Sequence, residues 1–175
     1  ADRADEDDAL TSQVTYRWAI DTAKKNALSF NAVNHEVITQ GQKASLQQLS
    51  LFAGSVGFER IVRQFNFNSQ SQIKGRTDFY YEGANHSLVS GDKAQDESAL
   101  KQQLTYRRGT DGQFSLRQVT VLAGDYNQEK TARVYNLKPD SKTIRSVTDF
   151  FYAGGKTADR ADEDDALTSQ VTYRW

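Results

Sequence analysis

Ala1–Trp18 reads ADRADEDDALTSQVTYRW, and Ala158–Trp175 repeats it letter for letter. A stretch of this length does not recur by chance, so the chain contains a tandem repeat whose copies begin 157 residues apart. In repeat proteins each unit packs mainly against its neighbours, so the repeat decides the architecture. We therefore expect one 157-residue period of a longer array, followed by an 18-residue overlap into the next copy.

A second, diverged repeat lies inside the period. Residues 46–83 and 116–154 share an Ala-Gly pair, a Glu, an Arg and a Thr-Asp-Phe motif in the same order. Another motif, Ala-Leu-x-x-Gln-x-Thr-Tyr-Arg, occurs three times, at Ala9–Arg17, Ala99–Arg107 and Ala166–Arg174. We expect the two diverged units to adopt the same backbone path.

The repeat divides the chain into three parts. A longer half-repeat covers 1–76, a shorter half-repeat covers 77–147, and 148–175 begins the next longer half-repeat, duplicating 1–18. The longer half carries about 20 additional residues at about 20–40. Their two apolar runs, separated by Asn-His, are typical of one inserted hairpin. An insertion of this size indicates that the hairpin is the elementary module.

Strand patterns dominate the sequence. Residues 14–18, 61–67 and 144–152 alternate β-branched or aromatic side chains with polar ones, which is typical of half-buried strands. Asp111-Gly112, between two such runs, predicts a hairpin turn.

These patterns predict an all-β fold of tandem antiparallel β-hairpin repeats, forming an elongated solenoid-like or spiral-sheet rod, because a hairpin gains a core only from its neighbours. We expect the rod to continue past both ends through head-to-tail contacts between neighbouring copies of the repeat. The expected core side of the duplicated stretch is Val14, Tyr16 and Trp18, and correspondingly Val171, Tyr173 and Trp175.

The run from Tyr106 through Asp111-Gly112 to Val119, with similar runs at Tyr135 and Tyr81, resembles the bacterial RHS/YD repeats. Members of that family are large tandem-repeat surface proteins whose hairpin modules wind into a spiralling β-sheet. The resemblance implies chained hairpins. It does not extend to a toxin-enclosing shell, because the family's Tyr-Asp signature is absent.

Composition narrows the class of protein. Eight Tyr and nine Phe are more than disordered segments carry. A net charge of −1 gives no electrostatic signature of nucleic-acid binding, and no apolar run approaches the roughly 20 residues of a membrane helix. We expect no nucleic-acid partner and no membrane insertion. The chain has no Cys, as is common in exported bacterial repeat proteins, so we expect an extracellular or cell-surface location.

Catalytic and metal-binding patterns are weak. The two histidines, His35 and His86, each lie in a predicted turn, and there is no Gly-x-Ser-x-Gly elbow and no Gly-x-x-x-x-Gly-Lys-Ser/Thr phosphate loop. We therefore expect no enzyme, no catalytic residue and no cofactor. The acidic run Asp2–Asp8, repeated as Asp159–Asp165, could offer oxygen ligands to Ca²⁺. It lacks the alternating spacing of a calcium loop, so a solvated acidic loop is the better interpretation.

Arginines recur in the predicted strands beside aromatic residues. They are Arg17, Arg63, Arg107, Arg133 and Arg145. Such a surface could stack on a nucleic acid or a glycan. The simpler interpretation is a cross-strand ladder that pairs arginine with Asp78, Asp149 or Glu59, and the near-neutral net charge favours it.

The sequence thus predicts a structural repeat module of an extracellular fibre, stalk or giant bacterial surface/adhesin protein, whose partners are neighbouring copies of the same repeat. The alternative is a carbohydrate- or protein-binding repeat module that presents an aromatic/Arg-rich face to a surface glycan or protein.

Overall fold

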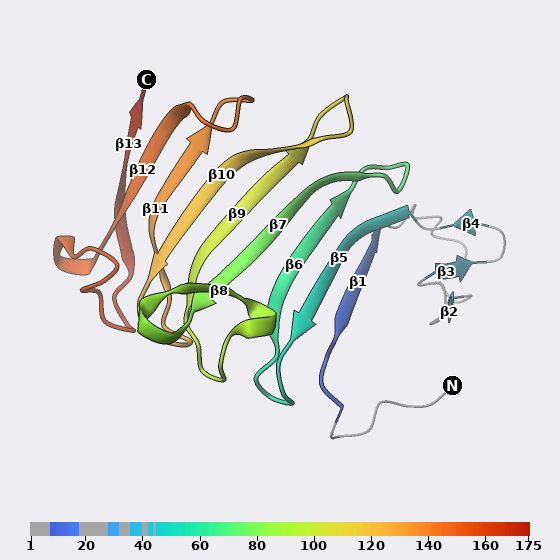
Figure 1. Cartoon of the computed structure of the whole chain (residues 1–175), viewed down its shortest axis with the longest axis horizontal. Helices are drawn as coiled ribbons and strands as arrows, with labels where there is room; N and C mark the ends of the chain where they lie inside the picture. The colour runs from blue at the N-terminus through green and yellow to red at the C-terminus, as the bar shows by residue number, and fades with distance from the viewer. Residues whose placement is uncertain (1–7, 18–27, 32–35, 40–41, 44) are drawn as a thin grey trace.

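The computed structural model describes residues 8–17, 28–31, 36–39, 42–43 and 45–175. In this part of the chain the regular structure is β-strand with short 3₁₀ turns, as the alternating patterns predicted (Figure 1). The main sheet contains β1 (Ser12–Arg17), β5 (Ser45–Ala53), β6 (Arg60–Phe67), β7 (Ile73–Glu82), β8 (Leu88–Ser90), β9 (Leu100–Arg108), β10 (Phe114–Ala123), β11 (Lys130–Leu137), β12 (Ile144–Tyr152) and β13 (Leu167–Arg174).

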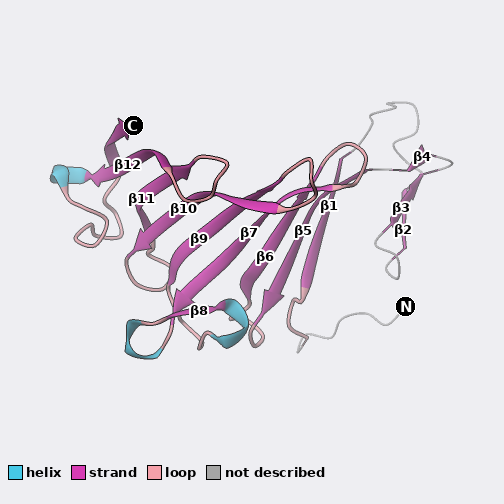
Figure 2. Ribbon diagram, turned by 45° about the horizontal axis from the view of Figure 1, so that its top comes forward, coloured by secondary structure: helices cyan, strands magenta, loops and turns pink. Residues whose placement is uncertain are grey.

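The main sheet is an open antiparallel meander. Its strand order is β1-β5-β6-β7-β9-β10-β11-β12-β13, with the short β8 paired to β7. Neighbouring hairpins therefore lie side by side in one twisted layer (Figure 2), with β1 and β13 at the two edges (Figure 1). The predicted hairpin around Asp111-Gly112 is confirmed, since this turn joins β9 to β10.

A smaller sheet lies in and just after the predicted insertion at about 20–40. It consists of β2 (Leu28–Asn31), β3 (Glu36–Thr39) and β4 (Gln42–Lys43). β2 and β3 pair antiparallel, as in a hairpin. Residues 18–27, 32–35 and 40–41 of this region lie outside the described part of the chain.

The two diverged units have the same strand order and register. Gln48 faces Asn66 across β5 and β6, just as Gln118 faces Asn136 across β10 and β11. The bulges also fall at matching positions in the two units. The common backbone path predicted from the internal repeat is thus present.

The register aligns one residue from each strand into rows that cross the sheet and alternate between its faces. One face, here called the aromatic face, carries the row Leu51, Arg63, Asp78, Leu104, Val119, Tyr135, Val147 and Tyr173. The other, here called the polar face, carries the row Gln13, Ser50, Gln64, Thr77, Thr105, Gln118, Asn136, Ser146 and Arg174.

Burial is concentrated where the segments after β7 and β12 fold back onto the sheet. Tyr81 and Tyr152, at or next to the ends of these strands, are both buried, and their hydroxyls donate to Ile61 O and Thr131 O at 2.9 Å each. Burial raises the pKa of Tyr81 to about 12. No large side chain in the described part is completely buried, because a single layer leaves most side chains partly open to water.

The prediction that one side of the last strand faces a core is wrong. Val171, Tyr173 and Trp175 are 40%, 51% and 74% exposed. β13 has a neighbouring strand on one side only, so little covers these side chains. In β1, Val14 and Tyr16 are half-buried, and Trp18 lies outside the described residues.

Candidate functional site

The most informative feature of the fold is a strand that occurs three times. β1, β9 and β13 all carry the Ala-Leu-x-x-Gln-x-Thr-Tyr-Arg motif. β9 lies inside the sheet and pairs with β7 on one side and β10 on the other, whereas β1 and β13 form the two edges. β9 therefore serves as an internal reference for what each edge strand can bind.

The pairing of β1 with β5 reproduces that of β9 with β10. Tyr16 faces Leu46 as Tyr106 faces Leu116, and the bulge that follows is the same. β1 thus has the neighbour that β9 has on its β10 side.

The pairing of β13 with β12 reproduces the other side of β9. Thr172 faces Thr148 as Thr105 faces Thr77. The two threonine hydroxyls lie 2.9 Å apart in the first pair and 3.2 Å apart in the second. The open side of β13 therefore corresponds to the side of β9 that binds β10, and the open side of β1 to the side that binds β7.

A glutamate carboxylate binds the backbone at the start of β9 and, in the same way, just before β1. Leu100 N donates to Glu129 Oε1 at 2.9 Å, and Leu10 N donates to Glu59 Oε1 at 3.1 Å. Backbone amides, its own and that of Leu10, lower the pKa of Glu59. Leu167 holds the same place in β13, at the edge where the described chain supplies no third glutamate.

The sequence had suggested Glu59 as a partner in the arginine ladder, but its carboxylate instead accepts hydrogen bonds from backbone amides. It binds the backbone of Leu10, which lies 49 residues away in sequence. The signal that could have shown this is the repeat itself, because Glu59 and Glu129 both stand five residues after the glycine of an Ala-Gly pair.

The other predicted ladder pairs are present on the aromatic face. Arg63 Nε lies 2.5 Å from Asp78 Oδ1. Arg133 binds Asp149 through two nitrogens, with Nη2 3.0 Å from Oδ2, and this hydrogen bonding raises the pKa of Arg133. Both guanidinium groups are therefore occupied by carboxylates.

The remaining ladder candidates are not paired in this way. Arg107 and Arg145 make no ion pair with any carboxylate in the described part. The side chain of Arg17 lies outside it.

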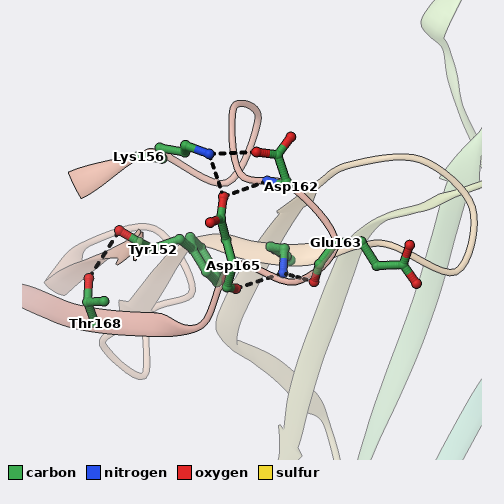
Figure 3. A network of polar contacts seen from close by, with 7 residues as sticks. Tyr152, Lys156, Asp162, Glu163, Asp165 and Thr168 are labelled. Carbon is green, nitrogen blue, oxygen red and sulfur yellow. Dashed lines mark hydrogen bonds and ion pairs between the residues drawn. The ribbon is translucent and has the colours of Figure 1, made fainter. Parts of the chain in front are cut away.

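The second acidic run folds into a loop that is held by lysines (Figure 3). Lys156 Nζ lies 2.6 Å from Asp162 Oδ2 and 2.8 Å from Asp165 Oδ2. These contacts raise the pKa of Lys156 to about 12 and lower that of Asp165. Lys130 Nζ also donates to the backbone carbonyls of Glu163 and Asp165, at 3.0 Å each. Two of the acidic side chains therefore neutralise a lysine.

No group of three or more His, Asp or Glu side chains in the described part is placed to share a metal ion. The first copy of the acidic run lies outside that part up to residue 7. His86 is exposed in the 3₁₀ turn Ala84–His86 and contacts the Glu82 carboxylate, while His35 lies outside the described residues.

No family model, curated protein or solved structure matches this chain. Among the described residues, no helix has the length and apolar content needed to cross a membrane. The geometry of the sheet edges therefore provides the main guide to function.

Proposed function

We propose that this chain is a structural repeat module of an extracellular fibre, stalk or giant bacterial surface/adhesin protein, in which the sheet continues from one copy of the repeat into the next. The observation that carries the proposal is that the same strand sequence occurs three times, as β1, β9 and β13. β9 has both neighbours, and each edge strand has one of the two in the same register.

In this proposal the next copy of β5 pairs with the open side of β13, as β10 pairs with β9. The next copy of Glu59 then accepts a hydrogen bond from Leu167 N. Such a contact joins different surfaces of successive copies, so it propagates without closing and yields a rod. Covering both edges also removes the exposed backbone groups that make edge strands prone to uncontrolled pairing.

The absence of Cys supports an extracellular setting for the rod. The resemblance to RHS/YD repeats, which also chain hairpins, stays a prediction. The aromatic face supports a structural role better than a binding role, because Arg63 and Arg133 are already paired with aspartates.

A chain with two periods tests the proposal. One period contributes eight strands to the main path of the sheet, β1 to β12 without β8 and the small sheet. At about 4.8 Å between strands, each added period should lengthen the molecule by roughly 38 Å, less any shortening from twist. Small-angle X-ray scattering of one-period and two-period chains measures this increment.

Electron microscopy of the native assembly provides the independent check. Density that repeats once per 157 residues would support the rod. A two-period chain that folds into two separate bodies, or native particles that are isolated monomers, would contradict it.

A further inference from the structure

The polar face contains a basic hollow that the ladder does not use. It has a volume of about 1170 Å³ and lies where the strands from β6 to β13 of the main path approach one end of the sheet. Six cationic side chains and no carboxylate are among its lining residues. The six are Lys74, Arg107, Arg108, Arg117, Arg145 and Arg174.

Three of these cations occupy β-bulges. Lys74, Arg117 and Arg145 are the residues skipped in the pairing of their strands with β6, β9 and β11 respectively. A bulge sets an additional residue into a strand and redirects its side chain, often next to a functional site. The three bulges therefore place three positive charges beside the rows of the polar face. In regular strands with strict alternation, these side chains would point to the opposite face.

The positive charge also repeats along the sheet. Lys74 and Arg107 lie on the neighbouring strands β7 and β9, and Arg145 and Arg174 occupy the corresponding positions on β12 and β13. The two pairs are four strands apart, or roughly 19 Å. A linear ligand that carries several negative charges could contact both pairs at once.

The cations are available for such a ligand. None of the six forms an ion pair with a carboxylate in the described part of the chain. Arg117 Nε is buried and has no hydrogen-bond partner among the described residues. Five of the six are arginines, whose planar guanidinium groups bind carboxylates, sulfates and phosphates through paired hydrogen bonds.

The neutral lining favours a carbohydrate over a nucleic acid. Asn66, Thr105, Asn136 and Ser146 line the hollow with amide and hydroxyl groups. Those of Thr105, Asn136 and Ser146 already hydrogen-bond to neighbouring side chains, and their remaining donor and acceptor sites suit sugar hydroxyls. Proteins that bind single strands of nucleic acid use free aromatic rings as stacking platforms. The only aromatic residue of the lining is Tyr106, and the Arg76 guanidinium already lies 4.6 Å from the centre of its ring.

From these observations we propose that the basic hollow binds a linear anionic polysaccharide, one that carries carboxylate or sulfate groups, along the polar face from β7 to β13. The proposal concerns the face of the sheet rather than its edges, and it holds whether or not successive copies join into a rod.

Isothermal titration calorimetry of the full 175-residue chain at low salt tests the proposal. Titration with a polygalacturonate fragment measures binding of carboxylates, and titration with a sulfated dextran measures binding of sulfates. Lys74→Gln/Arg145→Gln should weaken binding by about 10-fold or more, since a charge-assisted hydrogen bond contributes roughly 1.5–3 kcal/mol and 1.4 kcal/mol corresponds to a factor of ten. The matched control, Lys93→Gln/Arg160→Gln, removes the same net charge outside the hollow and should bind like the parent chain.

Arg174→Gln is a second test, and because this residue is exposed on the edge strand β13, the substitution should leave the fold intact. It should also weaken binding, and a neutral dextran should not bind the parent chain. Absence of binding to both polyanions would overturn the proposal. So would an equal loss in the control variant, or tighter binding of single-stranded DNA that the hollow variants abolish.

Discussion

At the scale of single residues, the two repeat units hold the same ion pair in different surroundings. The Asp78 side chain is 7% exposed and contacts both Arg63 and Arg76. Its counterpart Asp149 is 20% exposed and contacts one arginine, Arg133. Valine stands at the position that corresponds to Arg76, namely Val147. The first pair should therefore matter more for stability than the second.

Asp78→Ala should lower the free energy of unfolding by about 2 kcal/mol, because two guanidinium groups lose a largely buried partner. Asp149→Ala should cost less than about 1 kcal/mol, as is usual for pairs open to solvent. Urea denaturation of both variants measures the difference. Equal losses would show that burial does not distinguish the two sites.

Asp140, in the turn between β11 and β12, should make that turn sensitive to acid. The Thr143 hydroxyl and the amides of Thr143 and Lys142 donate to its carboxylate and lower its pKa to about 2. The folded pKa lies below the unfolded value of about 3.9. The stabilisation is therefore complete above about pH 4 and is lost as the pH falls through about 2.

NMR titration of the Asp140 carboxyl measures this shift. Thr143→Ala removes the hydroxyl donor, which contributes most to the shift, and should move the midpoint back toward the ordinary value for an aspartate. A midpoint that does not move would mean that the hydroxyl is not responsible.

At the scale of elements, the turn between β5 and β6 depends on one glycine more than on another. Gly54 has φ +127°, and a Cβ there would lie 2.4 Å from Phe58 O. Gly57 has φ +82°, but a Cβ would meet nothing within 4 Å. Gly57→Ala should cost about 1 kcal/mol from backbone strain alone.

Gly54→Ala should cost at least about 3 kcal/mol, because the backbone of the turn must also move to relieve the contact. Thermal unfolding of the two variants compares the costs. If the two alanines destabilise the protein equally, the close approach to Phe58 is not a constraint.

Local patterns predicted the strands and the turns of this fold. Period-two alternation and Asp111-Gly112 are readable because they depend on neighbours in sequence. The bulges at Lys74 and Arg117 could not be predicted, since a bulge exists only relative to a partner strand. The role of Glu59 was missed because its partner Leu10 N lies 49 residues away in sequence, just before β1, and only a comparison of the two repeat units points to it. The exposure of Tyr173 follows from the single-layer architecture, which no local pattern reveals.

At the scale of the whole molecule, the open side of β13 is the surface on which a rod depends. Trp175 N donates to Arg145 O of β12 at 3.2 Å. Amide directions alternate along a strand, so the amide of Thr172 faces the open side. Thr172→Pro removes that donor, which an edge strand tolerates, whereas Thr172→Ala keeps it.

We expect the parent chain and Thr172→Ala to associate end to end as concentration rises, with β13 of one chain taking the place of the identical β1 on β5 of another. Thr172→Pro should remain monomeric. Sedimentation velocity distinguishes these outcomes, and association of the proline variant as strong as that of the parent chain would exclude pairing through this edge.

The direction of the strands also determines how the molecule responds to tension. The strands of the main sheet cross its long axis (Figure 1). A pull applied along that axis acts directly on the hydrogen bonds between strands. The strands therefore separate one after another, beginning with the outermost pair. Each freed residue adds roughly 3.3 Å of contour length. An array built in this way behaves as an extensible spring, which yields in small steps at low force and shortens again as its strands re-pair.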